Sequence, residues 1–154
     1  MRLFYFSHHA ELTDAVDAAL ARVGEARIVD CHSFPDTPLQ CSLYQGDAKF
    51  DFNIGTDAFH TPTQWIDASI QFFRDRGFRL GIDEPYSGSL LPMKHYNNDI
   101  RVKSIMLEVN RKLYMEKNYT RGPLFDKTKE MITEYLKILR VMDVNNLKNA
   151  IFDH

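Results

Sequence analysis

The chain has 154 residues, a formal net charge of -2 and a pI of about 6.3, values that fit one soluble domain over residues 1–154. Hydrophobic residues make up 44% and charged residues 26%, which is ordinary for a globular protein. No basic stripe indicates a nucleic-acid partner, and no apolar run approaches the roughly 18 residues that a membrane helix needs.

The two cysteines, Cys31 and Cys41, are too few for a disulfide scaffold. The apolar residues after Met1 end at Ser7, which is too soon for a signal peptide. We therefore expect a reduced, cytoplasmic protein.

The first part of the chain predicts a helix and then a strand. Residues 7–24 form the helix, with Ser7 as its cap and Gly24 as its stop. Its apolar residues recur at helical spacing: Leu12, Val16, Leu20 and Val23. The β-branched run ARIVDCH, residues 26–32, predicts a buried strand, and a proline-rich loop follows over residues 33–40.

The middle of the chain predicts two strands around a second helix. KFDFNIGT, residues 49–56, alternates as a strand does. Thr61 is the expected helix cap, because Pro62 suits the first helical position and Gln64 completes a capping box. Gly77 ends this helix, and FRLGID, residues 78–83, is the third strand.

The last part predicts a loop over residues 84–92, a strand SIMLEVN over 104–110 and a helix over 126–142. The helix carries an apolar stripe made of Met131, Ile132, Tyr135, Leu136 and Leu139. Residues 141–154 have no clear pattern.

Helices and short apolar strands alternate, so we expect an α/β fold with helices covering a mostly parallel or mixed sheet. Ligands of such folds collect outside the carboxyl ends of the strands. Three polar clusters are expected at strand ends, at residues 30–33, 53–56 and 108–111.

Glu108 is the main catalytic candidate. On a strand it shares one face with Met106 and Asn110, while Leu107 and Val109 share the other. A carboxylate at the end of a buried strand suits general acid–base chemistry, because burial raises its pKa toward the working pH. The alternative is an ion pair with Arg111 or Arg101.

His32 emerges at the end of the first strand, where a neutral imidazole can bind a metal and Asp30 can orient it. The alternative is a hydrogen-bonded histidine at a strand end. One histidine does not make a catalytic zinc site, which typically has about three protein ligands.

The turn PYSGS, residues 85–89, is a candidate ligand contact. Tyr86 and Ser87 offer hydroxyl groups, and Gly88 allows close backbone approach. An ordinary turn is the alternative. His95 is a further candidate for a substrate contact, and equally a surface residue.

Together, the blocks DCHSFP, FDFNIGTDAFHTP, PYSGSLLP and IMLEVNRKLYM resemble the N-formylglutamate amidohydrolase family in order and spacing, from about residue 7 to residue 115. The resemblance implies a zinc-carboxypeptidase-like fold, a hydrolase-like three-layer α/β/α sandwich with a mixed, mostly parallel sheet. It implies metal-dependent hydrolysis of N-formyl-L-glutamate, or a related N-acyl amino acid, to formate and L-glutamate in histidine degradation.

The resemblance also implies residue roles. His32 falls on a late metal ligand of the family, with zinc as the expected ion, and Glu108 falls on its general base and acid. Arg111, with Tyr86, Ser87 and Gly88, would help to hold the substrate or Glu108.

Family members carry a preceding region that holds the first metal ligands, so this chain resembles an N-terminally truncated relative. We expect uncovered sheet edge that favours a homo-oligomer, and no measurable activity of the chain alone. A non-catalytic binding or oligomeric module is the alternative function.

Overall fold

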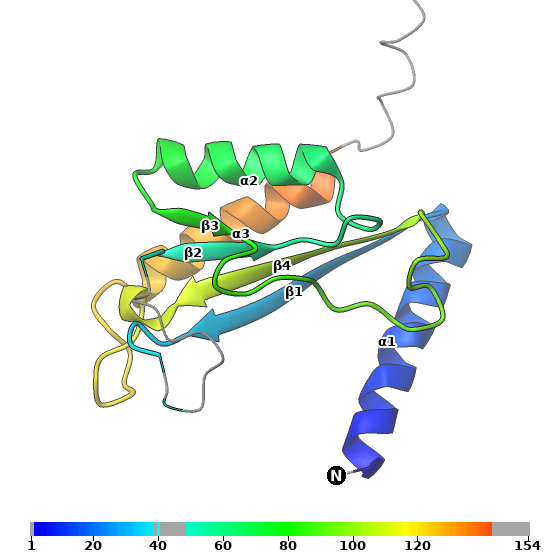
Figure 1. Ribbon diagram of the computed structural model, residues 1–154, viewed down its shortest axis with the longest axis horizontal. Coiled ribbons are helices and arrows are strands. Elements are labelled where there is room, and N and C mark those ends of the chain that lie inside the picture. Colours follow the sequence, from blue (N-terminus) through cyan, green and yellow to red (C-terminus); the bar gives the residue numbers. More distant parts are fainter. Residues whose placement is uncertain (1, 39, 41–48, 143–154) are drawn as a thin grey trace, which may run out of the picture.

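The computed structural model of the chain describes residues 2–38, 40 and 49–142 (Figure 1). Its helices and strands are, in order, α1 (Arg2–Val23), β1 (Ala26–Phe34), β2 (Phe52–Gly55), α2 (Thr63–Asp75), β3 (Leu80–Ile82), β4 (Val102–Asn110), the 3-10 helix η1 (Arg111–Leu113) and α3 (Phe125–Val141). Among these residues, no helix combines the length and the apolar character that crossing a membrane requires.

The strands form one mixed sheet in the order β1-β4-β2-β3. β1 runs parallel to β4 and β2 runs parallel to β3, while β2 and β4 are antiparallel. Helices flank this sheet, and α2 and α3 lie together on one side of it (Figure 1). The expected α/β fold with a mixed, mostly parallel sheet is confirmed.

The main core lies between the sheet and the pair α2 and α3. The odd-numbered residues of β4 contribute Ile105, Leu107 and Val109, all at most 6% exposed. The two helices contribute large side chains, above all Trp65 and Tyr135, which are 0% exposed. Because side chains alternate along a strand, this core leaves the even-numbered residues of β4 for the opposite face.

The first helix begins earlier than its sequence predicts. α1 starts at Arg2, so Ser7 lies inside the helix and is not its cap. Gly24 does end it: this residue has a φ of 79°, and its N–H donates to the Leu20 carbonyl at 3.0 Å. α1 packs through Val16 on a small second core with Ala26 and Val102.

The start of α2 also differs from the prediction. Pro62 is the cap, and no side chain forms a cap hydrogen bond there. Thr61 instead donates its hydroxyl to the Ser104 carbonyl at 2.7 Å and accepts the Asp57 N–H at 2.8 Å. The predicted capping box is therefore wrong, because the Thr61 hydroxyl ties the loop to β4. Gly77, with a φ of 77°, ends the helix as expected.

Candidate active site

Strand pairing gathers the polar candidates into one row across the sheet. His32 on β1 lies opposite Glu108 on β4, and Glu108 lies opposite Asn53 on β2. Directly paired residues point to the same face, so all three side chains lie on the face opposite α2 and α3. The parallel pairing of β1 and β4 is what brings two of the three expected polar clusters together at their carboxyl ends.

The third cluster is divided by the direction of its strand. Because β2 runs antiparallel to β4, its first residues, not its last, lie beside Glu108. Asn53 therefore joins the row. Thr56 lies beyond the other end of β2, where its hydroxyl donates to Asp83 at 2.6 Å. Residues 53–56 do lie at the end of β2, as expected, but Thr56 is not beside Glu108.

Glu108 is a buried carboxylate that forms no ion pair with any of the residues that the structure describes. The residue is 7% exposed, and its Oε2 atom is buried with no hydrogen-bond partner among the described residues. Burial raises the pKa of Glu108, and nearby Asp30 raises it further, while His32 and Arg111 lower it. A raised pKa makes such a carboxylate a better proton acceptor.

The alternative of an ion pair for Glu108 is wrong. Arg101 pairs with Asp99, at 2.7 Å between Nη2 and Oδ2. Arg111 donates from Nε to the Ser33 hydroxyl and from Nη2 to the Ser33 carbonyl, each at 3.2 Å. Both guanidinium groups are thus engaged by other partners.

His32 is oriented by Asp30 from two positions earlier on the same strand face. Its side chain is 50% exposed, and its Nε2 atom lies 2.8 Å from Asp30 Oδ1. When Nε2 donates this hydrogen bond, the neutral ring keeps an available lone pair on Nδ1. The expected role of Asp30 in orienting the imidazole therefore has the geometry it needs.

The described residues do not complete a metal site. No group of three or more His, Cys, Asp or Glu side chains within residues 2–38, 40 and 49–142 is arranged to hold an ion. A catalytic zinc typically has about three protein ligands and a water. His32 supplies one imidazole, so the donor set present here does not fit zinc by itself.

Asn53 holds the loop that passes over this face. Its amide donates to the Tyr86 carbonyl at 2.9 Å and accepts the Glu84 N–H at 3.0 Å. The Tyr86 ring packs edge-on against Phe34, with 5.9 Å between the centroids. The loop of residues 84–88 is thereby fixed beside the row of polar side chains.

Two glycines let this loop approach the sheet. A Cβ atom at Gly55 would collide with the Gly88 carbonyl oxygen and with the Met106 side chain. Gly88 itself has a φ of 83°, which favours glycine. Close approach is therefore the role of Gly55, whereas Gly88 provides the turn. Ser87 is exposed on the loop.

Arg111 lines a cavity of about 610 Å³ between β1 and α3. Cys31, His32 and Ser33 line the same cavity from β1, and Lys129 lines it from α3. Its bonds to Ser33 make Arg111 a link between the ends of β4 and β1.

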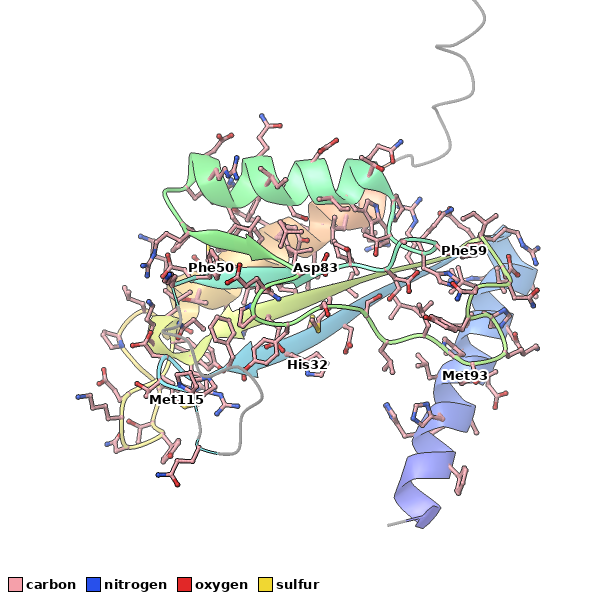
Figure 2. The ribbon with its side chains drawn as sticks, in the orientation of Figure 1. His32, Phe50, Phe59, Asp83, Met93 and Met115 are labelled. Atoms are coloured by element: carbon pink, nitrogen blue, oxygen red, sulfur yellow. The ribbon has the colours of Figure 1, made fainter. Side chains whose placement is uncertain are left out.

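The structure does not bring His95 to this site. His95 is 5% exposed, and its Nε2 lies 2.8 Å from Asp17 Oδ1 on α1. Its neighbour Met93 lies beside α1, whereas His32 of the site lies on β1, away from that helix (Figure 2). The alternative of a surface residue is also wrong, since His95 is a buried link between α1 and the loop before β4.

Two buried asparagines have roles that were not predicted from the sequence. Asn53 and Asn110 are both 0% exposed. Asn110 donates to the Phe50 carbonyl at 3.1 Å and accepts the Lys112 N–H at 3.1 Å, which begins η1. An amide among apolar strand residues was the available signal, because such a group is buried only when it is hydrogen-bonded.

Comparison with known proteins identifies the family. Residues 1–115 match the sequence profile described as N-formylglutamate amidohydrolase, which is well over half of the chain. The chain belongs to the N-formylglutamate amidohydrolase family. The row of His32, Glu108 and Asn53 lies within the matched residues. No curated protein matches the chain significantly.

Two solved structures resemble this member of the family. The N-formylglutamate amidohydrolase of Ralstonia eutropha JMP134 is 25% identical with a TM-score of 0.70, and the match covers 88% of this chain and 51% of that one. A gene product of Agrobacterium tumefaciens is 13% identical with a TM-score of 0.51, over 86% of this chain and 50% of that one, and shows the fold alone. The chain thus spans about half the length of either protein.

Proposed function

We propose that this chain carries the proton-transfer half of an amidohydrolase site for N-formyl or other N-acyl amino acids, with N-formyl-L-glutamate as the first substrate to test. The observation that carries the proposal is Glu108, a buried carboxylate that has no cationic partner within residues 2–38, 40 and 49–142 and lies opposite the Asp30-oriented His32. Family membership supports an amide as the bond that is broken.

In the proposed reaction, Glu108 removes a proton from a water molecule as its oxygen attacks the formyl carbon. The protonated Glu108 then returns this proton to the amide nitrogen while the carbon–nitrogen bond breaks. The products are formate and L-glutamate, and the carboxylate is regenerated. Burial assists the first step, because it raises the pKa of Glu108 and so eases uptake of the proton.

Other residues are assigned positioning and binding roles in the proposal. Arg111 and the loop carrying Tyr86, Ser87 and Gly88 border the site and are candidates to hold the substrate. The guanidinium of Arg111 has no carboxylate within ion-pair distance among the described residues, so its charge, although two of its nitrogens bond to Ser33, can still attract the carboxylate of an amino acid.

Zinc dependence stays a prediction. His32 is the proposed ligand from this chain, and its Nδ1 atom is available. Since the described residues supply no group of three ligands, metal analysis of the purified chain, repeated on His32→Ala, is the direct measurement.

Formate release from N-formyl-L-glutamate, measured with and without added zinc, tests the proposal. Glu108→Gln should lower the rate by roughly 10²- to 10⁴-fold, because the amide cannot accept the proton. Glu130→Gln, an exposed change on α3, is the matched control and should leave the rate unchanged. Formate release that survives in Glu108→Gln would contradict the assignment.

The second candidate function is a non-catalytic binding or oligomeric module. The lack of a three-ligand metal group among the described residues favours it. Absence of formate release from the unmodified chain in both conditions, together with absence of bound zinc, is its expected result.

A further inference from the structure

His60 is a buried histidine whose ring is hydrogen-bonded at both nitrogens. It is 0% exposed, its Nδ1 lies 2.8 Å from the Val102 carbonyl oxygen, and its Nε2 lies 3.0 Å from the Asn97 backbone nitrogen. A carbonyl oxygen only accepts a hydrogen bond, and a backbone N–H only donates one. The Nδ1 atom therefore carries the hydrogen, Nε2 is the acceptor, and the ring in this arrangement is neutral.

Both partners of this ring belong to the segment that holds α1. Asn97 lies in the loop before β4, residues 92–101, and Val102 is the first residue of β4. The same loop contacts α1 through His95, whose Nε2 lies 2.8 Å from Asp17 Oδ1. Val102 also belongs to the small core on which α1 packs. The ring of His60 thus fastens the loop that fastens α1.

We propose that His60 is a pH-sensitive switch, in which protonation of the ring releases the loop before β4 and, with it, α1. A protonated imidazole donates from both nitrogens, so its Nε2–H would face the Asn97 N–H, and that hydrogen bond would be lost. The charge would also be buried, with no carboxylate of the described residues in ion-pair contact with the ring. Opening of the loop brings the ring into water, where the charged form is stable. This switch goes beyond the proposed function and does not depend on it.

The titratable groups packed around His60 do not compensate a charge on its ring. Asp57, in the same turn, accepts the backbone N–H of His60 and bonds to no ring atom. The Tyr96 ring stacks on the imidazole, with 6.1 Å between the centroids. Lys103 on β4 is itself a cation, and it donates to the Ile100 carbonyl.

The charged groups of the loop respond to acid differently. His95 lies between Asp17 and Asp99, at 2.8 and 3.8 Å, so a proton on His95 strengthens the hold on α1. Arg101, chiefly, lowers the pKa of Asp99 to about 2, and Lys94 and His95 lower the pKa of Asp17. Both carboxylates therefore stay ionised above about pH 5, where histidines titrate. In this range, protonation of His60 is the change that opens the loop.

Hydrogen exchange of backbone amides at about pH 7.5 and about pH 5 tests the switch. The ring binds a proton in the opened state and not in the closed state, so the closed state is favoured at neutral pH. Opening should increase by up to roughly tenfold for each pH unit below about 6.5. Relative to free-peptide rates, we expect faster exchange at Asn97 and along α1 at the lower pH, and no change at Leu107 in the main core.

His60→Gln removes the titrating group and keeps a side-chain oxygen that can accept the Asn97 N–H. In this variant, exchange at Asn97 and along α1 should not depend on pH after the same correction. His8→Gln, an exposed change on α1, is the matched control and should keep the pH dependence of the unmodified chain. A pH dependence that persists in His60→Gln, or its absence from the unmodified chain, would overturn the proposal.

Nitrogen NMR of the unmodified chain tests the same switch without a substitution. At about pH 7.5, the chemical shifts of the His60 ring should show the hydrogen on Nδ1 and a bare Nε2. A hydrogen on Nε2 at that pH, or a ring that is protonated while the Asn97 amide stays protected, would reject the switch. Both measurements are made without substrate, so a failure of the switch leaves the hydrolase proposal standing, and the reverse also holds.

Discussion

At the residue scale, the burial of Glu108 affects its pKa more than any direct contact does. Its strand places it on the face away from the main core, yet it is only 7% exposed. Desolvation disfavours its charged form, and no cation lies within ion-pair distance among the described residues to compensate. A carboxylate that is buried without a compensating cation reduces the stability of the fold when it is ionised. Such a group is better suited to carrying a proton than to stabilising the structure.

This environment predicts a pH-dependent stability. The pKa of Glu108 is raised above its ordinary value of 4.5, so the folded chain binds this proton more tightly than the unfolded chain does. Its contribution to the free energy of unfolding is present below pH 4.5 and is lost as pH rises through the folded-state pKa.

Urea denaturation from about pH 4 to about pH 8 measures this effect. The stability of the unmodified chain relative to Glu108→Gln should fall as pH rises. The exposed change Glu130→Gln should show no such trend. A relative stability that increases with pH would mean that Glu108 has a cationic partner in solution.

At the element scale, the loop of residues 84–88 is attached to the sheet by one amide. Asn53 satisfies a backbone donor and a backbone acceptor of this loop from a fully buried position on β2. Gly55, two residues later on the same face, admits the Gly88 carbonyl. β2 is thus the support of the candidate substrate loop, although β2 itself has only four residues.

Asn53→Ala should reduce the free energy of unfolding by about 1–3 kcal/mol, because the Glu84 N–H and the Tyr86 carbonyl both lose a buried partner. Asn53→Asp keeps the acceptor for Glu84, but it loses the donor to Tyr86 and adds a buried carboxyl group opposite Glu108, so it should also be destabilising. Thermal denaturation of both variants measures the difference. Equal stability of Asn53→Ala and the unmodified chain would show that the loop does not depend on this amide.

At the scale of the whole molecule, a charged junction joins α1 to the loop before β4. Asp17 on α1 contacts His95 at 2.8 Å and Lys94 at 2.6 Å. Asp99 contacts Arg101 at 2.7 Å and lies 3.8 Å from the His95 ring. These contacts border the small core of α1, which is separate from the core under α2 and α3.

This junction should weaken in acid. Arg101, chiefly, and His95 lower the pKa of Asp99 from 3.8 to about 2. The folded chain therefore binds this proton less tightly than the unfolded chain, and the stabilisation is present above pH 3.8 and lost as pH falls through about 2.

In Asp99→Asn, the free energy of unfolding should fall less steeply as pH decreases than in the unmodified chain. Urea denaturation between about pH 5 and about pH 2 measures this slope. Asp14→Asn, an exposed change on α1, is the matched control and should keep the acid loss. An unchanged acid side in Asp99→Asn would place the acid-sensitive group elsewhere. The sign is opposite to that of Glu108, so the two variants separate the two effects.

The sequence by itself determined the kinds of elements, the division of the two faces of β4 and the family. These signals are local properties of the sequence: the spacing of hydrophobic residues, the glycines that end helices and the four motif blocks. Each has the same meaning in the folded chain as in the sequence. Local patterns were less reliable at helix starts: Ser7 and Thr61 both have the residue type of a cap, but neither forms one, since α1 begins earlier and the Thr61 hydroxyl bonds to β4.

Only the tertiary structure decided the strand order, the direction of β2 and the partners of each charge. These depend on contacts between residues far apart in the chain. Such contacts form only in the folded protein, so they produce no periodic pattern in the sequence. That is why His95 belongs to the α1 junction, why Arg111 bonds to Ser33, and why Glu108 has no cationic partner in the described part of the chain. The same tertiary arrangement leaves β1 at the edge of the sheet, because pairing with β4 occupies only one of its two sides.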